Sequence, residues 1–226
     1  MPNLQITALI LWLVPWVGIM TAYFLSAQAG EIPSCFPHLD GCTSISSVGR
    51  HPPGFFIFKA TMLPVAAFTM IYWKLCYDWL AAMGDTARWQ NSAMLWLGLL
   101  SSLALIPYVV FLGSEGDVYR LLRHYGTTFY FGFMYLAQAL LASRISALAP
   151  QGTLAVSITR LKVAMCVVIL IGGLIMAATD KVIEDDKEIE NISEWLVASM
   201  MTFYPFLTWL LWRDSGFETG FTVRNG

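Results

Sequence analysis

The sequence predicts an all-α integral membrane protein: one domain over residues 1–226, a bundle of six transmembrane helices with one long extracytoplasmic loop. Of the 226 residues, 57% are hydrophobic and only 12% are charged, whereas soluble domains have about 45–50% apolar and about 25% charged residues. Six apolar stretches come close to or meet the roughly 20 residues that a spanning helix needs. A closed β-barrel is excluded, because period-2 alternation is absent and the apolar runs are too long.

Short connections that hold most of the charged residues separate the six expected spans. These spans are residues 6–25, 55–80, 93–112, 118–145, 161–179 and 195–212. The first span has no basic residue before it, unlike a cleaved secretory signal, so we expect it to be retained as a helix. Pro15 interrupts this span, and we expect neighbouring helices to cover the carbonyl group that the proline leaves free.

The segment 26–54 between the first two spans is the longest polar interruption of the chain. Its several proline and glycine residues rule out a regular helix through it. Cys35 and Cys42 bracket a six-residue interval in this exposed loop, which suits a disulfide in an oxidising compartment. Cys76 and Cys166 lie within apolar spans, where we expect them to be inert.

The later spans have their own local signals. Lys59 lies one turn into the second span, from where its side chain can reach the interface. Pro107 lies near the end of the third span, before a tight turn at residues 113–117. In the fifth span, Gly172 and Gly173 permit close approach of another helix. Ser193 is the expected N-cap of the sixth span.

Six spans place both termini on one side of the membrane. Lysine and arginine are slightly more frequent on that side, which favours a cytoplasmic location for the termini. The expected disulfide favours the same orientation, with the 26–54 loop outside. The many tryptophans near span ends, among them Trp73, Trp79, Trp195 and Trp212, are expected to form an interfacial belt.

This topology gathers polar residues at one pole of the bundle. The candidate lipid-binding or partner-binding residues are Asp40, Arg50, His51, Arg120, Arg123, His124 and Glu194. Arg120, Arg123 and His124 are spaced i, i+3 and i+4, so they share one helix face. Glu194 is expected to pair with Arg123 or Arg120, because an unpaired charge at the membrane boundary is costly. The other residues would then line a shallow outward pocket; the alternative is that these charges only anchor helix ends at headgroup level.

No catalytic residue, metal site or cofactor is predicted. The sequence has no His-Glu-x-x-His motif and no glycine-rich phosphate loop. His38, His51 and His124 with Asp40 have ligand types suited to zinc but no known spacing. Ser44, Ser46 or Ser47 could join a histidine and Asp40 in a triad, but the nucleophile-elbow pattern is absent. The net charge of −2 gives no reason to expect a nucleic-acid partner.

Three motifs together resemble the Frag/DRAM/Sfk family of membrane proteins. They are the segment 44–58, which reads SISSVGRHPPGFFIF; Arg123-His-Tyr-Gly126 with the aromatic helix that reaches Gln138 and Arg144; and Ser193-Glu-Trp195 followed by Phe203-Tyr-Pro-Phe-Leu-Thr208 and Asp214. The chain departs from the family at Ser47 and Gly54, where many members have acidic residues. The resemblance implies six spans with cytosolic termini. It also implies roles near lipids: remodelling of glycosylphosphatidylinositol anchors, phosphoinositide and lipid-asymmetry homeostasis, and modulation of autophagy.

We expect this protein to be a non-catalytic, lipid-interacting multi-pass membrane protein that holds a lipid headgroup or partner at the outer polar pole. Basic residues beside aromatic helix ends suit phosphate-bearing headgroups. Two alternatives stay open: a lipid-remodelling enzyme for acyl transfer or hydrolysis, and a small subunit of a larger membrane complex. The expected partners are membrane lipids and a protein that docks on the 26–54 loop.

Overall fold

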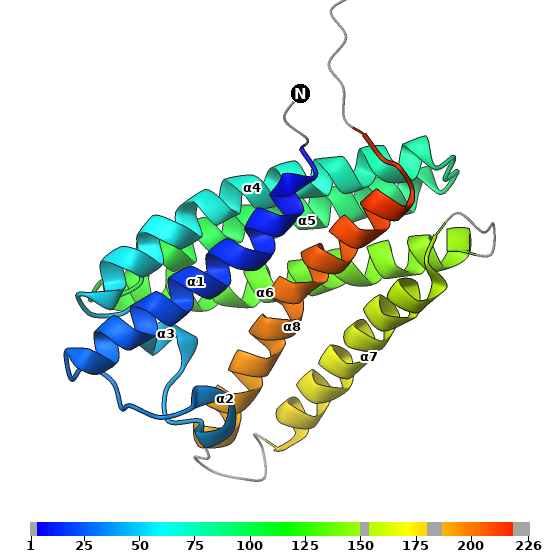
Figure 1. Ribbon diagram of the computed structural model, residues 1–226. Helices are drawn as coiled ribbons and strands as arrows, with labels where there is room; N and C mark the ends of the chain where they lie inside the picture. Colours follow the sequence, from blue (N-terminus) through cyan, green and yellow to red (C-terminus); the bar gives the residue numbers. More distant parts are fainter. Residues whose placement is uncertain (1–3, 150–153, 180–186, 219–226) are drawn as a thin grey trace, which may run out of the picture.

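The computed structural model describes residues 4–149, 154–179 and 187–218 of the chain (Figure 1). Every regular element in these ranges is a helix: α1 (Ile6–Gln28), α2 (Pro37–Asp40), α3 (Ile45–Val48), α4 (Gly54–Ala82), α5 (Arg88–Val110), α6 (Asp117–Leu148), α7 (Val156–Thr179) and α8 (Lys187–Asp214). The six long helices are long and apolar enough to cross a membrane. The predicted fold class and number of spans are therefore confirmed.

The long helices extend beyond most of the predicted spans. The largest difference is at the start of α8, which begins at Lys187 rather than at residue 195. With 32 residues, α6 is about 48 Å long at 1.5 Å per residue, whereas the hydrocarbon core of a bilayer is about 30 Å thick. The added residues at the start of α8 are mostly polar, so the hydropathy pattern did not include them. The apolar runs thus predicted the segment suited to the membrane, not the ends of the helices.

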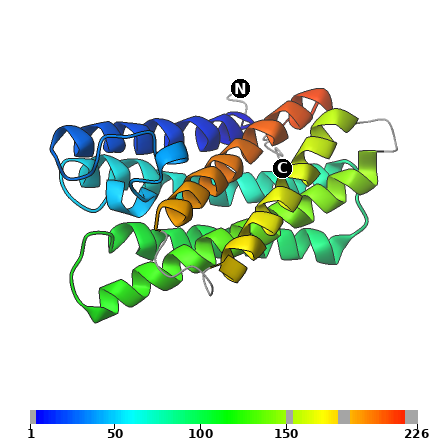
Figure 2. The same cartoon turned by 90° about the horizontal axis from the view of Figure 1, so that it is seen from below.

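The six long helices form a closed ring. Each packs against the next in chain order from α4 to α8, and α1 completes the ring by packing on both α4 and α8. Figures 1 and 2 show α4, α5 and α6 side by side, with α8 crossing them obliquely. The side-chain amide of Gln5 donates a hydrogen bond to the carbonyl oxygen of Phe217. Both described chain ends therefore meet at one end of the bundle, which we call the terminal pole.

The opposite end, which we call the loop pole, holds residues 29–53 and the first turns of α4, α6 and α8. No long helix runs through residues 29–53, but this segment contains α2 and α3. It is not freely exposed: Thr43, Ile45 and Val48 are buried, and α2 packs on α8 while α3 packs on α1. The loop expected at residues 26–54 is therefore a folded cap on the bundle.

The interior of the bundle is built around large aromatic side chains. Trp73, Trp79, Trp195 and Trp212 are fully buried, so the expectation of an interfacial belt is wrong for these four. A Cβ on Gly98 would lie 2.1 Å from the ring of Trp73, which shows that a glycine makes room for this side chain. Position near a span end did not reveal burial, because burial depends on which face of a helix packs against its neighbours.

A buried ion pair stabilises the terminal pole. Arg144 in α6 donates to both carboxylate oxygens of Asp85, at 2.9 Å and 2.7 Å, and to the side-chain oxygen of Gln90 at 3.0 Å. The Asp85 side chain is only 1% exposed. The hydrogen bonds from Arg144 lower the pKa of Asp85 below its usual range, against the opposing effect of burial. This bidentate pair fastens the α4–α5 connection to the end of α6.

Candidate functional site

The end of the loop segment packs on the turn between α5 and α6. Gly113 in this turn has a φ of 82°, and a Cβ at this position would lie 2.5 Å from the carbonyl oxygen of Arg50. Glycine meets both requirements, a left-handed backbone and close approach of another chain segment. Arg50 and His51 are thereby held beside the turn that leads into α6.

Four basic side chains around this turn are exposed, and we call them the cationic corner: Arg50, His51, Arg120 and His124. Arg120 contacts Asp117 at 3.1 Å, but the two side chains are 76% and 92% exposed, so this pair contributes little stability. The ring of His124 lies beside that of Tyr125, with 5.7 Å between centroids. The corner thus presents cations that water or an anionic group can reach.

Two further cations at this pole have structural partners. Arg123 donates through Nη1 to the carbonyl oxygen of Phe111 at 3.1 Å and also to that of Ser114. Lys59 donates to the carbonyl oxygen of Val110 at 2.6 Å. The last carbonyl groups of a helix have no partner within the helix. Arg123 and Lys59 therefore satisfy the end of α5.

Glu194 does not pair with an arginine, and this part of the prediction is wrong. Its carboxylate faces the backbone N–H groups of Ile45 and Ser46 at the start of α3. Arg123 and Arg120 have the other partners described above, and the ion pairs of the described ranges do not include Glu194. The folded cap explains the difference, because it lays α3 over α8 and offers backbone donors to the carboxylate.

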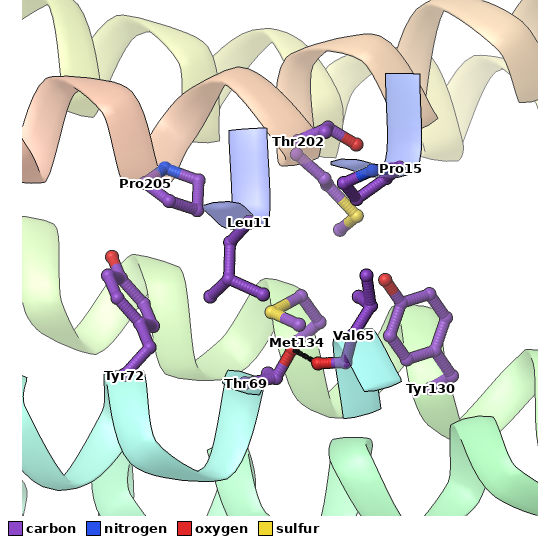
Figure 3. Close-up of a pocket in the computed structure, with 10 residues that line it drawn as sticks. Leu11, Pro15, Val65, Thr69, Tyr72, Tyr130, Met134, Thr202 and Pro205 are labelled. Carbon is purple, nitrogen blue, oxygen red and sulfur yellow. Dashed lines mark hydrogen bonds between the residues drawn. The ribbon is translucent and has the colours of Figure 1, made fainter. Parts of the chain in front are cut away.

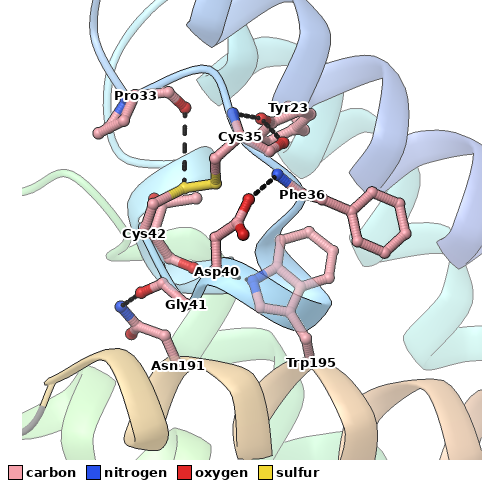
Figure 4. Close-up of a disulfide and its surroundings, with 10 residues drawn as sticks. Tyr23, Pro33, Cys35, Phe36, Asp40, Gly41, Cys42, Asn191 and Trp195 are labelled. Carbon is pink, nitrogen blue, oxygen red and sulfur yellow. Dashed lines mark hydrogen bonds between the residues drawn. A yellow bond between two sulfur atoms is a disulfide. The ribbon is translucent and has the colours of Figure 1, made fainter.

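Asp40 lies in the small disulfide-bonded loop shown in Figure 4. The predicted disulfide between Cys35 and Cys42 is present. Asp40 accepts a hydrogen bond from the backbone N–H of Phe36 at 2.7 Å, and the hydroxyl of Tyr23 in α1 bonds to both the N–H and the C=O of Cys35. Asp40 therefore stabilises the turn at α2 and lies apart from the cationic corner.

Side chains of α8 fix the other side of this loop. Asn191 donates to the carbonyl oxygen of Gly41 at 2.7 Å, and the indole N–H of Trp195 donates to that of Thr43 at 2.9 Å. Gly41 has a φ of 60°, and a Cβ there would lie 2.1 Å from a backbone oxygen of α8. The cap is thus held on α8 by specific bonds as well as by apolar packing.

Gly126 allows α5 and α6 to meet closely just below the cationic corner. A Cβ on Gly126 would lie 2.9 Å from the backbone nitrogen of Tyr108 and 3.0 Å from the carbonyl oxygen of Ala104. Gly172 and Gly173 behave differently from the prediction, because a Cβ on either would meet no atom of the described ranges within 4 Å. A glycine therefore permits close helix packing at Gly126, between α5 and α6, but not at Gly172 and Gly173 within the described ranges.

A buried polar network at α7 and α8 was not predicted. Lys162 is fully buried, and its Nζ donates to the hydroxyl of Thr208 at 2.6 Å and to the carbonyl oxygen of Tyr204 at 3.2 Å. Nζ also lies 3.2 Å from the centroid of the Tyr204 ring. Tyr72 in α4 bonds to the same Thr208 hydroxyl at 2.7 Å. Lys162 therefore ties α7 to α8, and through Thr208 to α4.

Gln138 extends this network to α6. Pro205 in α8 has no N–H, which leaves the carbonyl group of Met201 without its usual helical donor. The side-chain N–H of Gln138 donates to that carbonyl at 3.1 Å, and the hydroxyl of Tyr204 donates to the backbone oxygen of Gln138 at 2.6 Å. Pro205 was the feature of the sequence that could have indicated this bond. A carbonyl group that a proline leaves free inside a membrane needs a donor, such as a polar side chain of a neighbouring helix.

A small pocket of about 30 Å³ lies inside the bundle rather than at the loop pole. Its lining comes from α1, α4, α6 and α8 (Figure 3): Leu11, Pro15, Val65, Thr69, Tyr72, Tyr130, Met134, Met201, Thr202 and Pro205. By the criterion of about 10–15 Å³ per water, it has room for about two water molecules. It does not correspond to the outward pocket expected beside the cationic corner.

The structure also shows the surroundings of the side chains considered for catalysis and metal binding. The hydroxyl of Ser44 lies 3.0 Å from that of Ser46 and 2.8 Å from that of Ser47, and it accepts from the backbone N–H of Ser47 as the N-cap of α3. In the ranges that the structure describes, no group of three His, Cys, Asp and Glu side chains could hold a metal ion. Ser44 therefore caps α3, and the hydroxyls of Ser46 and Ser47 bond to it.

Comparison with known proteins identifies one family. The family model described as the Frag1/DRAM/Sfk1/Cwh43P N-terminal domain matches residues 3–212. No curated protein and no solved structure matches the chain.

Proposed function

The chain belongs to the family of the Frag1/DRAM/Sfk1/Cwh43P N-terminal domain, and we propose that it is a non-catalytic, lipid-interacting membrane protein. The proposed ligand is a phosphate-bearing lipid headgroup at the cationic corner. The observation that carries this proposal is the set of four exposed basic side chains gathered around the α5–α6 turn. Arginine is well suited to phosphate because its planar guanidinium group offers several donors in a fixed arrangement.

The surroundings of the cationic corner suit an amphiphilic ligand. Exposed aromatic side chains lie close to the cations in sequence, among them Phe56 (62% exposed), Tyr119 (41%) and Tyr125 (49%). Aromatic residues favour the headgroup level of a membrane. The weak pair of Arg120 with Asp117 costs little to exchange for a phosphate. A headgroup could thus bind the cations while its acyl chains contact the first half of α6.

Native mass spectrometry of the detergent-purified protein tests this proposal. The probes are phosphatidic acid and a diacylglycerol with the same acyl chains, which differ by the phosphate alone. We expect preferential retention of phosphatidic acid. Arg50 and Arg120 should each contribute about 1 kcal/mol to binding of phosphatidic acid. Loss of both should therefore weaken this binding by about thirtyfold. The variant is Arg50→Gln/Arg120→Gln, and the matched control is Arg88→Gln/Arg160→Gln at the terminal pole, where both arginines are also exposed.

Two results would overturn the proposal. One is equal retention of the two lipids by the wild-type protein. The other is an equal loss of phosphatidic acid in the variant and in the control, which would indicate a general charge effect. A lipid whose mass changes on incubation with the purified protein would contradict the non-catalytic part of the proposal and favour a remodelling enzyme.

The proposed orientation has both termini in the cytoplasm and the loop pole outside. The Cys35–Cys42 disulfide at the loop pole supports this orientation, because such bonds persist in oxidising compartments. A membrane-impermeant maleimide on intact cells is expected to label Glu115→Cys and to label Glu218→Cys only after permeabilisation. The reverse pattern would contradict the orientation. Cys76 and Cys166 are buried and give little background.

The cap also offers a surface for the proposed protein partner. Phe36 and Leu39 of this segment are 60% and 73% exposed. We expect a protein that co-purifies in fixed ratio to be lost from Phe36→Ser/Leu39→Ser and kept by Arg50→Gln/Arg120→Gln. Loss from both variants would place the partner across the cationic corner instead.

A further inference from the structure

The short helix α2 lies in the wedge between α1 and α8 at the loop pole, where these helices diverge (Figures 1 and 4). Its one histidine, His38, points into this wedge among aromatic rings. The imidazole stacks on Trp16 of α1 at 5.7 Å between centroids with an interplanar angle of 14°. It also lies 5.1 Å from the ring of Trp195 in α8 and 5.7 Å from that of Phe36.

The hydrogen bond between His38 and Ser199 indicates which ring nitrogen of His38 carries the proton. Nε2 lies 3.1 Å from the hydroxyl oxygen of Ser199. That hydroxyl already donates its proton to the carbonyl oxygen of Trp195 at 2.6 Å, so towards His38 it can only accept. Nε2 is therefore the protonated nitrogen of the neutral ring, and Nδ1 is unprotonated.

Nδ1 is buried and has no hydrogen-bond partner among the described residues. A proton added there would create a buried N–H group of a charged ring without an acceptor. Burying a charged donor without a partner is costly. Contact with the electron-rich faces of Trp16 and Trp195 offsets part of this cost, but it provides no acceptor in hydrogen-bonding geometry.

The titratable groups around this wedge come from α2, α8 and α1. On α2 itself, Asp40 accepts from the N–H of Phe36. On α8, Glu194 faces the N–H groups of α3, and Glu190 lies a turn before it. On α1, the nearby titratable group is Tyr23, which bonds to the backbone of Cys35. With burial as the single cause, the pKa of His38 is lowered from its usual value near 6.5.

We propose that His38 is an acid-sensitive latch: uptake of a proton at Nδ1 releases α2 from α1 and α8. His38 binds a proton less well when α2 is docked on α1 and α8 than when α2 is released. Docking is therefore fully favourable above the ordinary histidine pKa and weakens as the pH falls below it. The bonds of Cys35 to Tyr23 and of Gly41 to Asn191 flank α2 and confine the movement to residues 36–40. Release would expose the aromatic surface of Trp16 and Trp195 to water or to a partner.

Two measurements on the full-length protein test the latch. The chain has three histidines, so the ring signals of ¹³C-histidine-labelled protein are assignable through His51→Gln and His124→Gln. We expect His38 to remain the Nε2–H tautomer at neutral pH and to titrate at lower pH than the two exposed histidines. Amide protection in residues 36–40, corrected for intrinsic exchange, should fall as the pH drops below the ordinary histidine pKa of about 6.5, by at most about tenfold per pH unit, and should level off once His38 is protonated in the docked state as well.

The variant His38→Phe keeps an aromatic ring in the wedge and removes the titration. In this variant we expect the protection of residues 36–40 to be independent of pH over the same range. His51→Phe is the matched control and should keep the wild-type pH dependence. Titration of His38 together with the exposed histidines, or protection that does not change as His38 titrates, would overturn the proposal. The wild-type titration decides the question even if His38→Phe fails to fold. The titration of His38 does not depend on lipid binding at the cationic corner, so failure of one proposal leaves the other standing.

Discussion

The cationic corner contains four basic side chains and the interior network contains one, Lys162, and the surroundings of these side chains are opposite in kind. At the corner, Arg120 is exposed and its ion pair with Asp117 is weak. In the interior, Lys162 is fully buried and bonds to a hydroxyl and a carbonyl group of α8. An exposed cation is available to a ligand, whereas a buried one is committed to the fold unless its partners change. The first arrangement suits binding and the second suits the positioning of helices.

The largest effect is expected from the most buried ion pair. Arg144→Met leaves the carboxylate of Asp85, 1% exposed, without its charged partner, and should reduce the free energy of unfolding by about 3–5 kcal/mol. Lys74→Met is the control, because its pair with Asp78 is 58% and 44% exposed and is worth about 0.5 kcal/mol or less. Unfolding in detergent measures both. Equal losses would remove the distinction between buried and exposed pairs.

A smaller but still large loss is expected where Gly126 brings α6 against the backbone of α5. Gly126→Leu forces a side chain against the backbone of α5, 2.9 Å from the nitrogen of Tyr108, and should cost about 3 kcal/mol. Gly132→Leu on the same helix, where a Cβ would meet no described atom within 4 Å, should change stability by about 0.5 kcal/mol or less. Similar melting temperatures for the two variants would contradict the proposed packing of α5 on α6.

Thr208→Val tests the interior network directly. It removes the hydroxyl to which both Lys162 and Tyr72 bond and keeps the shape, so the Lys162 amine and the Tyr72 phenol lose a partner. The expected loss is about 2–3 kcal/mol. Lys162→Met should cost less, because it removes the buried amine together with its need for acceptors. Thr202→Val is the control, since its hydroxyl bonds to a carbonyl of its own helix.

The smallest effect is expected from acid. Arg144 lowers the pKa of Asp85, so this pair stabilises the fold fully above the ordinary aspartate pKa of about 3.9. The stabilisation is lost as the pH falls through the lower value of the folded state. The melting temperature of the wild-type protein should therefore fall more steeply below about pH 4 than that of Arg144→Met. Parallel profiles would show that another carboxylate dominates acid unfolding.

The sequence was sufficient for the fold class, the six spans, the Cys35–Cys42 disulfide and the family. These depend on long apolar runs and on spacings that a single chain displays. The partner of Glu194 was not predictable, because it depends on how residues 29–53 fold back on α8. The role of Lys162 was missed for a related reason: a lysine near the start of an apolar span resembles an interfacial anchor until helix packing buries it. The burial of the four tryptophans was not predictable for the same reason, because it depends on how the helices pack.

Photo-cross-linking with a phosphatidic acid analogue that carries a diazirine in its headgroup locates the bound headgroup. We expect cross-links to peptides that contain Arg50 and His51 and to the start of α6. These cross-links should be reduced in Arg50→Gln/Arg120→Gln and unchanged in Arg88→Gln/Arg160→Gln. Cross-links concentrated at the terminal pole, or unaffected by loss of Arg50 and Arg120, would contradict a headgroup site at the cationic corner.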